Sequence, residues 1–219
     1  VSICEGETAV FTVDAGSTAN PSYQWYYDAG SGPKPLAGET GSTLSFTATT
    51  ALNGYRYSVV VSGLCPSPVT STAATLTVKE APEIAAPPSD ISVCAGQDAE
   101  FTADAGATAN PHYQWYVNSG SGWNPVSGTR YIGGTTSTLT VVSVIELMSG
   151  YQYRVRVTGD CLPYAESVPV TLTVLHPPEI TQQPSGEEAC EGTAATFTVN
   201  AGATNNPAYQ WQVSTDGTT

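Results

Sequence analysis

The stretch AGATANPHYQW at residues 105–115 decides the fold, because the chain repeats it at a regular spacing. AGSTANPSYQW stands at residues 15–25, and AGATNNPAYQW stands at residues 201–211. An alternating apolar run precedes each copy, and each copy ends on a tryptophan. Self-similarity of this kind indicates a chain built from several copies of one structural unit.

Further landmarks extend the repeat in both directions. A first cysteine lies 21 residues before each tryptophan, and in two units a late tyrosine is followed ten residues later by a second cysteine. The landmarks are Cys4, Trp25, Tyr55 and Cys65 in the first unit, Cys94, Trp115, Tyr151 and Cys161 in the second, and Cys190 and Trp211 in the third.

Proline-rich segments separate the units. KEAPEIAAPPSD (79–90) and LHPPEITQQPSG (175–186) align without gaps, and their prolines favour stiff, extended links. We therefore predict three modules: residues 1–80 without an opening strand, residues 81–176 complete, and residues 177–219 with early strands only. We expect the six residues by which the second module exceeds the first to lie in a hairpin or loop near residues 129–134.

Apolar residues alternate with polar ones at a period of two within each module. In AEFTADA the residues Ala99, Phe101, Ala103 and Ala105 share one face, and in YQYRVRV (151–157) tyrosine and valine alternate with glutamine and arginine. Short alternating strands separated by Gly, Pro, Ser and Asn predict an all-β, two-sheet sandwich. The pattern leaves no room for a helix of any length.

The charge balance excludes one class of partner. The chain carries 19 acidic and 6 basic residues, a net charge of −13, which repels phosphate backbones and so argues against nucleic acid binding. A membrane-spanning helix needs about 18 consecutive apolar residues, and the sequence contains no such stretch. VSICEGET, at the start, lacks the features of a signal peptide, so we interpret the chain as mature or as an internal piece.

Modules of 90–96 residues with these aromatic landmarks resemble immunoglobulin-like (Ig-like) sandwiches. The resemblance covers the whole chain and implies tandem Ig-like β-sandwiches. It assigns Trp25, Trp115 and Trp211 to the core position of the third strand, and Tyr55 and Tyr151 to the corner that opens a late strand.

The cysteines depart from the antibody pattern. Aromatic and aliphatic residues hold the usual inter-sheet positions, while the cysteines precede the second strand or follow the late strand. We expect a bond within each of the first two modules, Cys4–Cys65 and Cys94–Cys161, and a partner for Cys190 outside the chain.

This arrangement resembles the tandem Ig-like repeats of large bacterial cell-surface proteins, including the repetitive adhesins of gliding and related bacteria. The resemblance implies an extracellular stalk or adhesive fibre whose partners are other copies of the module, in tandem or in a filament. It also allows a cell-surface or glycan ligand. Few lysines and widely spaced cysteines suit the same extracellular setting.

Catalytic motifs are missing from the sequence. It contains no GxSxG, HExxH or phosphate-loop pattern, and neither His112 nor His176 belongs to a recurring constellation. We therefore predict no catalytic residue, no cofactor and no enzymatic activity for this segment.

Acidic residues gather near the first junction, at Glu80, Glu83 and Asp90. Calcium favours clustered oxygen ligands, but only Glu83 has a counterpart, Glu179, at the second junction. We favour a solvated acidic surface without a metal, and a calcium site at these three residues is the alternative.

Three other functions stay open. Trp123 lies in a hairpin tip where the core does not require it, so it either packs on its own loop or contacts a glycan. The chain could also be an accessory or carbohydrate-binding module of a large secreted enzyme. Completion of module one by a strand donated from another subunit is the third.

Overall fold

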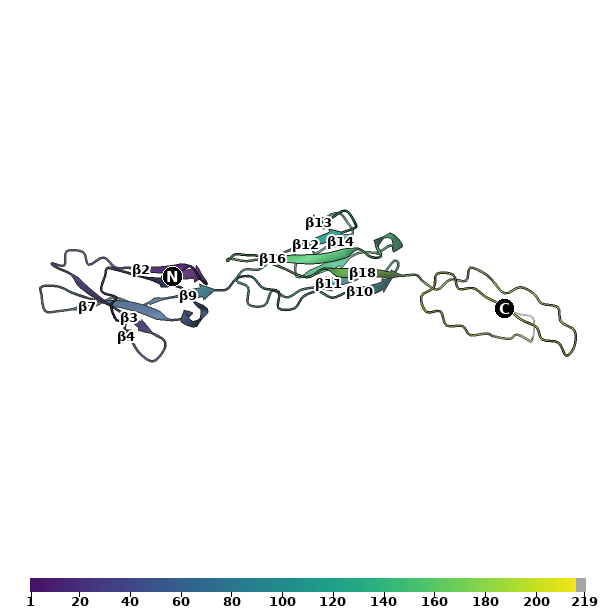
Figure 1. Ribbon diagram of the computed structural model, residues 1–219, viewed down its shortest axis with the longest axis horizontal. Coiled ribbons are helices and arrows are strands. Elements are labelled where there is room, and N and C mark those ends of the chain that lie inside the picture. The colour runs from purple at the N-terminus through teal and green to yellow at the C-terminus, as the bar shows by residue number, and fades with distance from the viewer. Residues whose placement is uncertain (216–219) are drawn as a thin grey trace. The chain divides into compact units, whose positions relative to one another are not determined.

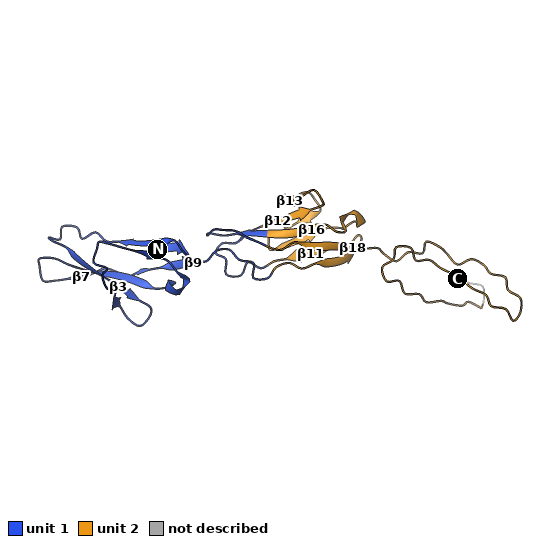
Figure 2. Cartoon of the chain, viewed as in Figure 1, with its two compact units in different colours: residues 1–86, 104–113, 156–166 blue, residues 87–103, 114–155, 167–219 orange. Residues whose placement is uncertain are grey.

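The computed structural model describes residues 1–215 (Figure 1). They form two compact units (Figure 2). The first comprises residues 1–86, 104–113 and 156–166, and the second comprises residues 87–103, 114–155 and the described part of 167–219. The module boundaries 1–80, 81–176 and 177–219 stay a prediction, and residues 216–219 of the third module lie outside the described residues.

Module one folds as two facing layers of short strands. One sheet has the order β4–β3–β6–β7, with β8 also on β6; β2 pairs with β5, and β1 runs parallel to β9. The strands are β1 Ser2–Cys4, β2 Thr8–Thr12, β3 Ser22–Asp28, β4 Lys34–Pro35, β5 Thr43–Thr47, β6 Arg56–Ser62, β7 Val69–Thr70, β8 Ala74–Thr75 and β9 Thr77–Lys79.

Module two repeats this topology. One sheet has the order β10–β18–β16–β12–β13, with β17 on β16, and the other has the order β11–β15–β14. The strands are β10 Ile91–Cys94, β11 Ala99–Thr102, β12 His112–Asn118, β13 Trp123–Pro125, β14 Tyr131–Ile132, β15 Thr138–Val141, β16 Gln152–Thr158, β17 Ala165–Glu166 and β18 Val170–Leu175.

The alternating pattern sets the core, as predicted. Ala99, Phe101, Ala103 and Ala105 are all buried, and the Tyr and Val residues of β16 are buried between its polar ones. The all-β prediction is confirmed. The exceptions are two single 3₁₀ turns, η1 Thr50–Leu52 and η2 Glu146–Met148.

The tryptophans of the first two modules occupy the predicted core position. Trp25 and Trp115 are 3% and 0% exposed. The indole N–H of Trp25 donates to the Gly41 carbonyl at 3.0 Å, and that of Trp115 donates to the Thr136 carbonyl at 2.9 Å. A buried indole thus keeps its hydrogen bond while its ring fills the space between the sheets.

The deepest tyrosines are not the ones the sequence selected. Tyr55 and Tyr151 are half-buried, whereas Tyr57 and Tyr153, two residues further along the same face, are buried. Tyr153 stacks on Phe101 with the ring centroids 4.7 Å apart. Burial is the main cause that raises the pKa of both buried phenols.

The segment of module two that holds the extra residues contains an additional strand, β14 Tyr131–Ile132. β14 pairs antiparallel with β15, and Tyr131 lies 6.4 Å, centroid to centroid, from Tyr153. The predicted position of the insertion is confirmed.

The third segment, residues 177–215, has one isolated bridge between Gln182 and Asn200 and no strand among its described residues. Trp211 is 51% exposed, so its assignment to a core is wrong here. The segment corresponds to residues 81–119 of module two and contains no counterparts of β15, β16 and β18. Without facing strands, its apolar residues have no second layer to pack against.

Candidate functional site

One disulfide joins two cysteines that are 157 residues apart in the sequence and that the repeat assigns to different predicted modules. Cys4, at the end of β1, is bonded to Cys161, which follows β16, with the two Cα atoms 5.7 Å apart. Cys65, Cys94 and Cys190 are free and exposed. The predicted bonds Cys4–Cys65 and Cys94–Cys161 are therefore both wrong.

Strand direction explains the correction. Thr75 of β8 pairs with Arg56, which starts β6. The chain continues past this point into β9, whose last residue, Lys79, pairs with Cys4, so Cys4 lies near the start of β6. Cys65 follows the other end of β6, and a strand of about seven residues spans roughly 20 Å. Bonded cysteines need Cα atoms within about 7 Å, so the two cysteines of one module lie too far apart. The order of strand directions in the sequence could have revealed this.

Polar contacts surround the disulfide. The ammonium group of Lys79 lies 2.5 Å from a carboxylate oxygen of Asp160, and the side-chain amide of Asn110 donates to both carboxylate oxygens at 3.0 and 3.1 Å. The hydrogen bond from Lys79, followed by that from Asn110, lowers the pKa of Asp160. All of these residues belong to the first compact unit.

The proline-rich linker is fixed to a neighbouring loop of the same unit. The amide N–H of Glu83 donates to the Thr108 hydroxyl at 3.0 Å, and the Glu83 carboxylate accepts from Ala107 N–H at 3.1 Å. Ala85 N–H donates to the Asp104 carbonyl at 2.8 Å. We call these three contacts the linker lock.

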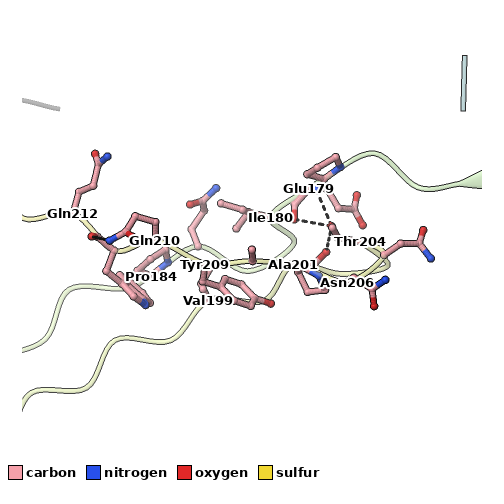
Figure 3. A pocket seen from close by; sticks show the side chains of 16 residues that line it. Glu179, Ile180, Pro184, Val199, Ala201, Thr204, Asn206, Tyr209, Gln210 and Gln212 are labelled. Atoms are coloured by element: carbon pink, nitrogen blue, oxygen red, sulfur yellow. Dashed lines mark hydrogen bonds between the residues drawn. The ribbon is translucent and has the colours of Figure 1, made fainter. Parts of the chain in front are cut away.

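The second linker makes the same contacts. Glu179 N–H donates to the Thr204 hydroxyl at 3.0 Å, and the Glu179 carboxylate accepts from Ala203 N–H at 3.4 Å. Figure 3 shows the Glu179–Thr204 contact of this lock. An open cavity of about 750 Å³ lies beside it, with Tyr209 among its lining residues. The lock is thus a property of the repeat and forms even where the sandwich is incomplete.

The acidic residues proposed for calcium are used differently. Glu83 belongs to the linker lock, and Asp90 accepts the Thr171 N–H at 2.7 Å. Within residues 1–215, no group of three or more His, Cys, Asp or Glu side chains could hold a metal ion. The calcium alternative that includes Glu80 therefore has no support in this part of the chain.

Trp123 lies at the start of β13, against its own sheet. The guanidinium carbon of Arg154 lies 4.4 Å from the centroid of the Trp123 ring and 5.6 Å from that of Tyr116. A cation over the ring covers one of its faces. This arrangement agrees with packing of Trp123 on its own module, and the glycan contact stays a prediction.

Solved structures with the same architecture are tandem immunoglobulin domains. The I67–I69 fragment of titin matches with a TM-score of 0.63 and 17% identity, over 84% of this chain and 65% of that one. The first eight Ig domains of the Down syndrome cell adhesion molecule match with a TM-score of 0.56 and 16% identity, over 78% of this chain and 23% of that one. The fold is immunoglobulin-like.

A sequence relative is Endoglucanase C of Cellulomonas fimi, 34% identical over 174 residues. The match covers 78% of this chain but only 15% of that protein. No family model matches the chain. Among residues 1–215, no helix has the length and apolarity that crossing a membrane would need.

Proposed function

We propose that the chain is a non-catalytic spacer of a larger extracellular protein, in which neighbouring Ig-like modules are covalently joined. The observation that carries this proposal is the Cys4–Cys161 bond, because its two cysteines come from different predicted modules. Such a bond gives pulling force a second covalent path beside the linker. Disulfides persist in oxidising compartments, which supports a location outside the cytosol.

The polar contacts add orientation rather than strength. An exposed ion pair such as Lys79–Asp160 contributes about 0–1 kcal/mol. The linker lock at Glu83 and its counterpart at Glu179 instead fix the path of the chain where it leaves one module. A spacer needs such defined junctions, because with a freely jointed linker the orientation of one module would not constrain the orientation of the next.

Single-molecule force spectroscopy tests the spacer function. The bond spans 157 residues, which at about 3.5 Å per extended residue hides roughly 550 Å of chain from extension. We expect this length to appear only after reduction. The Cys161→Ser variant should release it without reductant. Equal extension of the unreduced protein and of this variant would remove the proposal.

A second candidate role is an accessory module of a secreted polysaccharide-degrading enzyme. The relative named Endoglucanase C favours it, because this chain resembles a segment of that protein. Co-sedimentation with insoluble cellulose tests direct carbohydrate binding, with Trp123→Ala as the variant. If the bound fraction is negligible, or is unchanged in the variant, the carbohydrate contact at Trp123 is excluded while the spacer function stands.

The adhesive stalk of a bacterial surface protein is the other setting for such a spacer. The tandem arrangement and the linker lock support it as they support the enzyme-linked role. The sequence on either side of this chain separates the two: many further repeats favour the surface stalk, and a catalytic domain favours the accessory role.

A further inference from the structure

An open cavity borders the free cysteine of module one. It measures about 640 Å³ and is lined by residues from two segments, 13–19 and 61–71, with Cys65 among them. These segments correspond to residues 103–109 and 157–167 of module two. The cavity can therefore be compared with a place in the same molecule where the cysteine is bonded.

In module two the equivalent place is filled by the linker. Glu83 hydrogen-bonds to Thr108 there, and a β-carbon added at Gly159 would lie 3.4 Å from the Pro82 ring. The bonded Cys161 stands two residues after this glycine. The cavity beside Cys65 thus has the position that a Pro-Glu-Ile linker occupies one module later.

The loop that carries Cys65 shares a backbone hydrogen bond with the bonded loop. Leu64 N–H donates to the Ala19 carbonyl at 3.2 Å, as Asp160 N–H donates to the Ala109 carbonyl at 3.1 Å. This contact between the two segments that line the cavity therefore forms in module one as it does in module two.

The opposite half of the bond is also repeated. Cys94 pairs with Leu175 across the parallel strands β10 and β18, as Cys4 pairs with Lys79 across β1 and β9. Cys94 is free and exposed. A module of this kind therefore presents a first-strand cysteine at its exit end, beside the start of its linker.

We propose that the Cys65 face of module one, which residues 13–19 and 61–71 form, binds the exit end of another module of this repeat. The exit end is the end that carries the first-strand cysteine and the start of the linker. The Pro-Glu-Ile linker of that module fills the cavity, and its first-strand cysteine forms a disulfide with Cys65. The inference rests on the proposed spacer function and names the partner of its free face.

The bond forms by oxidation. Two thiol S–H bonds are lost and one S–S bond is made. Two protons and two electrons pass to a small-molecule disulfide such as oxidised glutathione, which is reduced to two thiols.

A nearby residue selects which module fits. Leu64, 73% exposed, stands where Asp160 stands in module two. Asp160 pairs with Lys79, and the position of Lys79 holds Leu175 at the next junction. An apolar residue at this position, as module two has, can pack on Leu64, whereas a lysine there would lack the carboxylate that Asp160 supplies to Lys79. We therefore expect the Cys65 face to favour a module with an apolar residue at this position.

A lengthened chain tests the proposal. A second copy of residues 87–186 is fused to the N-terminal side of Val1, which keeps the repeat spacing and adds a module whose exit end carries Cys94 and Leu175. After equilibration in glutathione buffer, free thiols are alkylated and disulfide peptides are mapped by mass spectrometry. Of seven cysteines, three should be alkylated, with the added copy of Cys94 bonded to Cys65. Five alkylated cysteines, or Cys65 bonded elsewhere, would overturn the proposal.

Matched variants separate a specific bond from chance oxidation. Cys65→Ser with Ser67→Cys moves the thiol within one exposed loop and should leave the added Cys94 alkylated. Leu175→Lys in the added module should reduce the bonded fraction, and Leu64→Asp should restore it by recreating the Lys79–Asp160 pair. Equal bonding in all variants would contradict the proposed docking.

The same disulfide mapping distinguishes failure of the docking proposal from failure of the spacer proposal. If Cys4–Cys161 is present while Cys65 is alkylated, the docking inference fails and the spacer function stands. If Cys4–Cys161 is also absent, the covalent spacer fails with it.

Discussion

Two equivalent tryptophans in this chain have opposite environments. Trp115 is enclosed between two sheets, and Trp211 is half exposed in the third segment. We expect Trp115→Ala to lower the free energy of unfolding of module two by about 3–5 kcal/mol, because the indole leaves a large cavity. Denaturant titration read out by hydrogen exchange of module two amides measures the loss.

Trp211→Ala is the matched control for that substitution. Trp211 is half exposed and lies in the third segment, so its removal should change the stability of module two by no more than about 0.5 kcal/mol. Similar losses in the two variants would show that burial does not distinguish these positions.

Asp160 is the titratable residue that reports on the junction. Its pKa lies below its ordinary value because Lys79 and Asn110 hydrogen-bond to the carboxylate. A depressed folded-state pKa stabilises the fold above the unfolded-state pKa, and this contribution is lost as pH falls through the folded-state value. The contact should therefore persist at neutral pH and weaken only in acid.

An NMR titration of the Asp160 carboxyl carbon checks this prediction. Lys79→Met should move the pKa up toward the ordinary range, and Lys34→Met, on β4, should leave it in place. An unchanged pKa in Lys79→Met would show that the ion pair does not form in solution.

The linker lock tests the role of a single loop element. A β-carbon at Gly106 would collide with the Glu83 carboxylate and lie 2.9 Å from the Ala85 β-carbon, whereas one at Gly16, its equivalent, would meet nothing within 4 Å. Both glycines have a left-handed φ, +53° and +55°, so either alanine costs about 1–2 kcal/mol in strain.

Gly106→Ala should additionally open the lock, and Gly16→Ala should not. Hydrogen exchange at the Ala107 amide, which donates to Glu83, should accelerate in the first variant only. Equal exchange rates in the two variants would mean that the lock does not hold the linker.

Element by element, the alternation of residues was enough to predict the sandwich. Phe101, Trp115 and Val155 each follow a period of two, and the structure buries all three. The position of the inserted strand β14 followed from spacing alone. Depth within a face was harder: Tyr151 and Tyr153 share a face, and only the facing sheet makes the second one the deeper.

At the scale of the whole molecule, alkylation distinguishes the observed disulfide from the pairs expected from sequence. With Cys4–Cys161 as the disulfide, the non-reduced chain should take up three alkyl groups, at Cys65, Cys94 and Cys190, and five after reduction. Two bonds within modules would leave a single reactive thiol. Intact mass spectrometry separates these outcomes directly.

The disulfide pairing could not be obtained from the spacing of the cysteines in the sequence, because that spacing does not tell in which direction each strand runs. Cys4 and Cys65 flank one module in sequence, yet β1 and β6 bring them to opposite ends. Trp211 shows the same limit in another form. Its local sequence closely matches that of Trp115, but burial belongs to the assembled strands and not to the motif.

The cross-module bond also constrains how such a protein can change its length. A disulfide of this kind needs one cysteine from each of two successive repeats, here Cys4 and Cys161. Gene duplication that inserts a whole period supplies one donor of each kind and preserves the matching. Recombination with breakpoints inside a repeat leaves one cysteine without a bonding partner. Changes in the length of the protein should therefore add or remove complete modules.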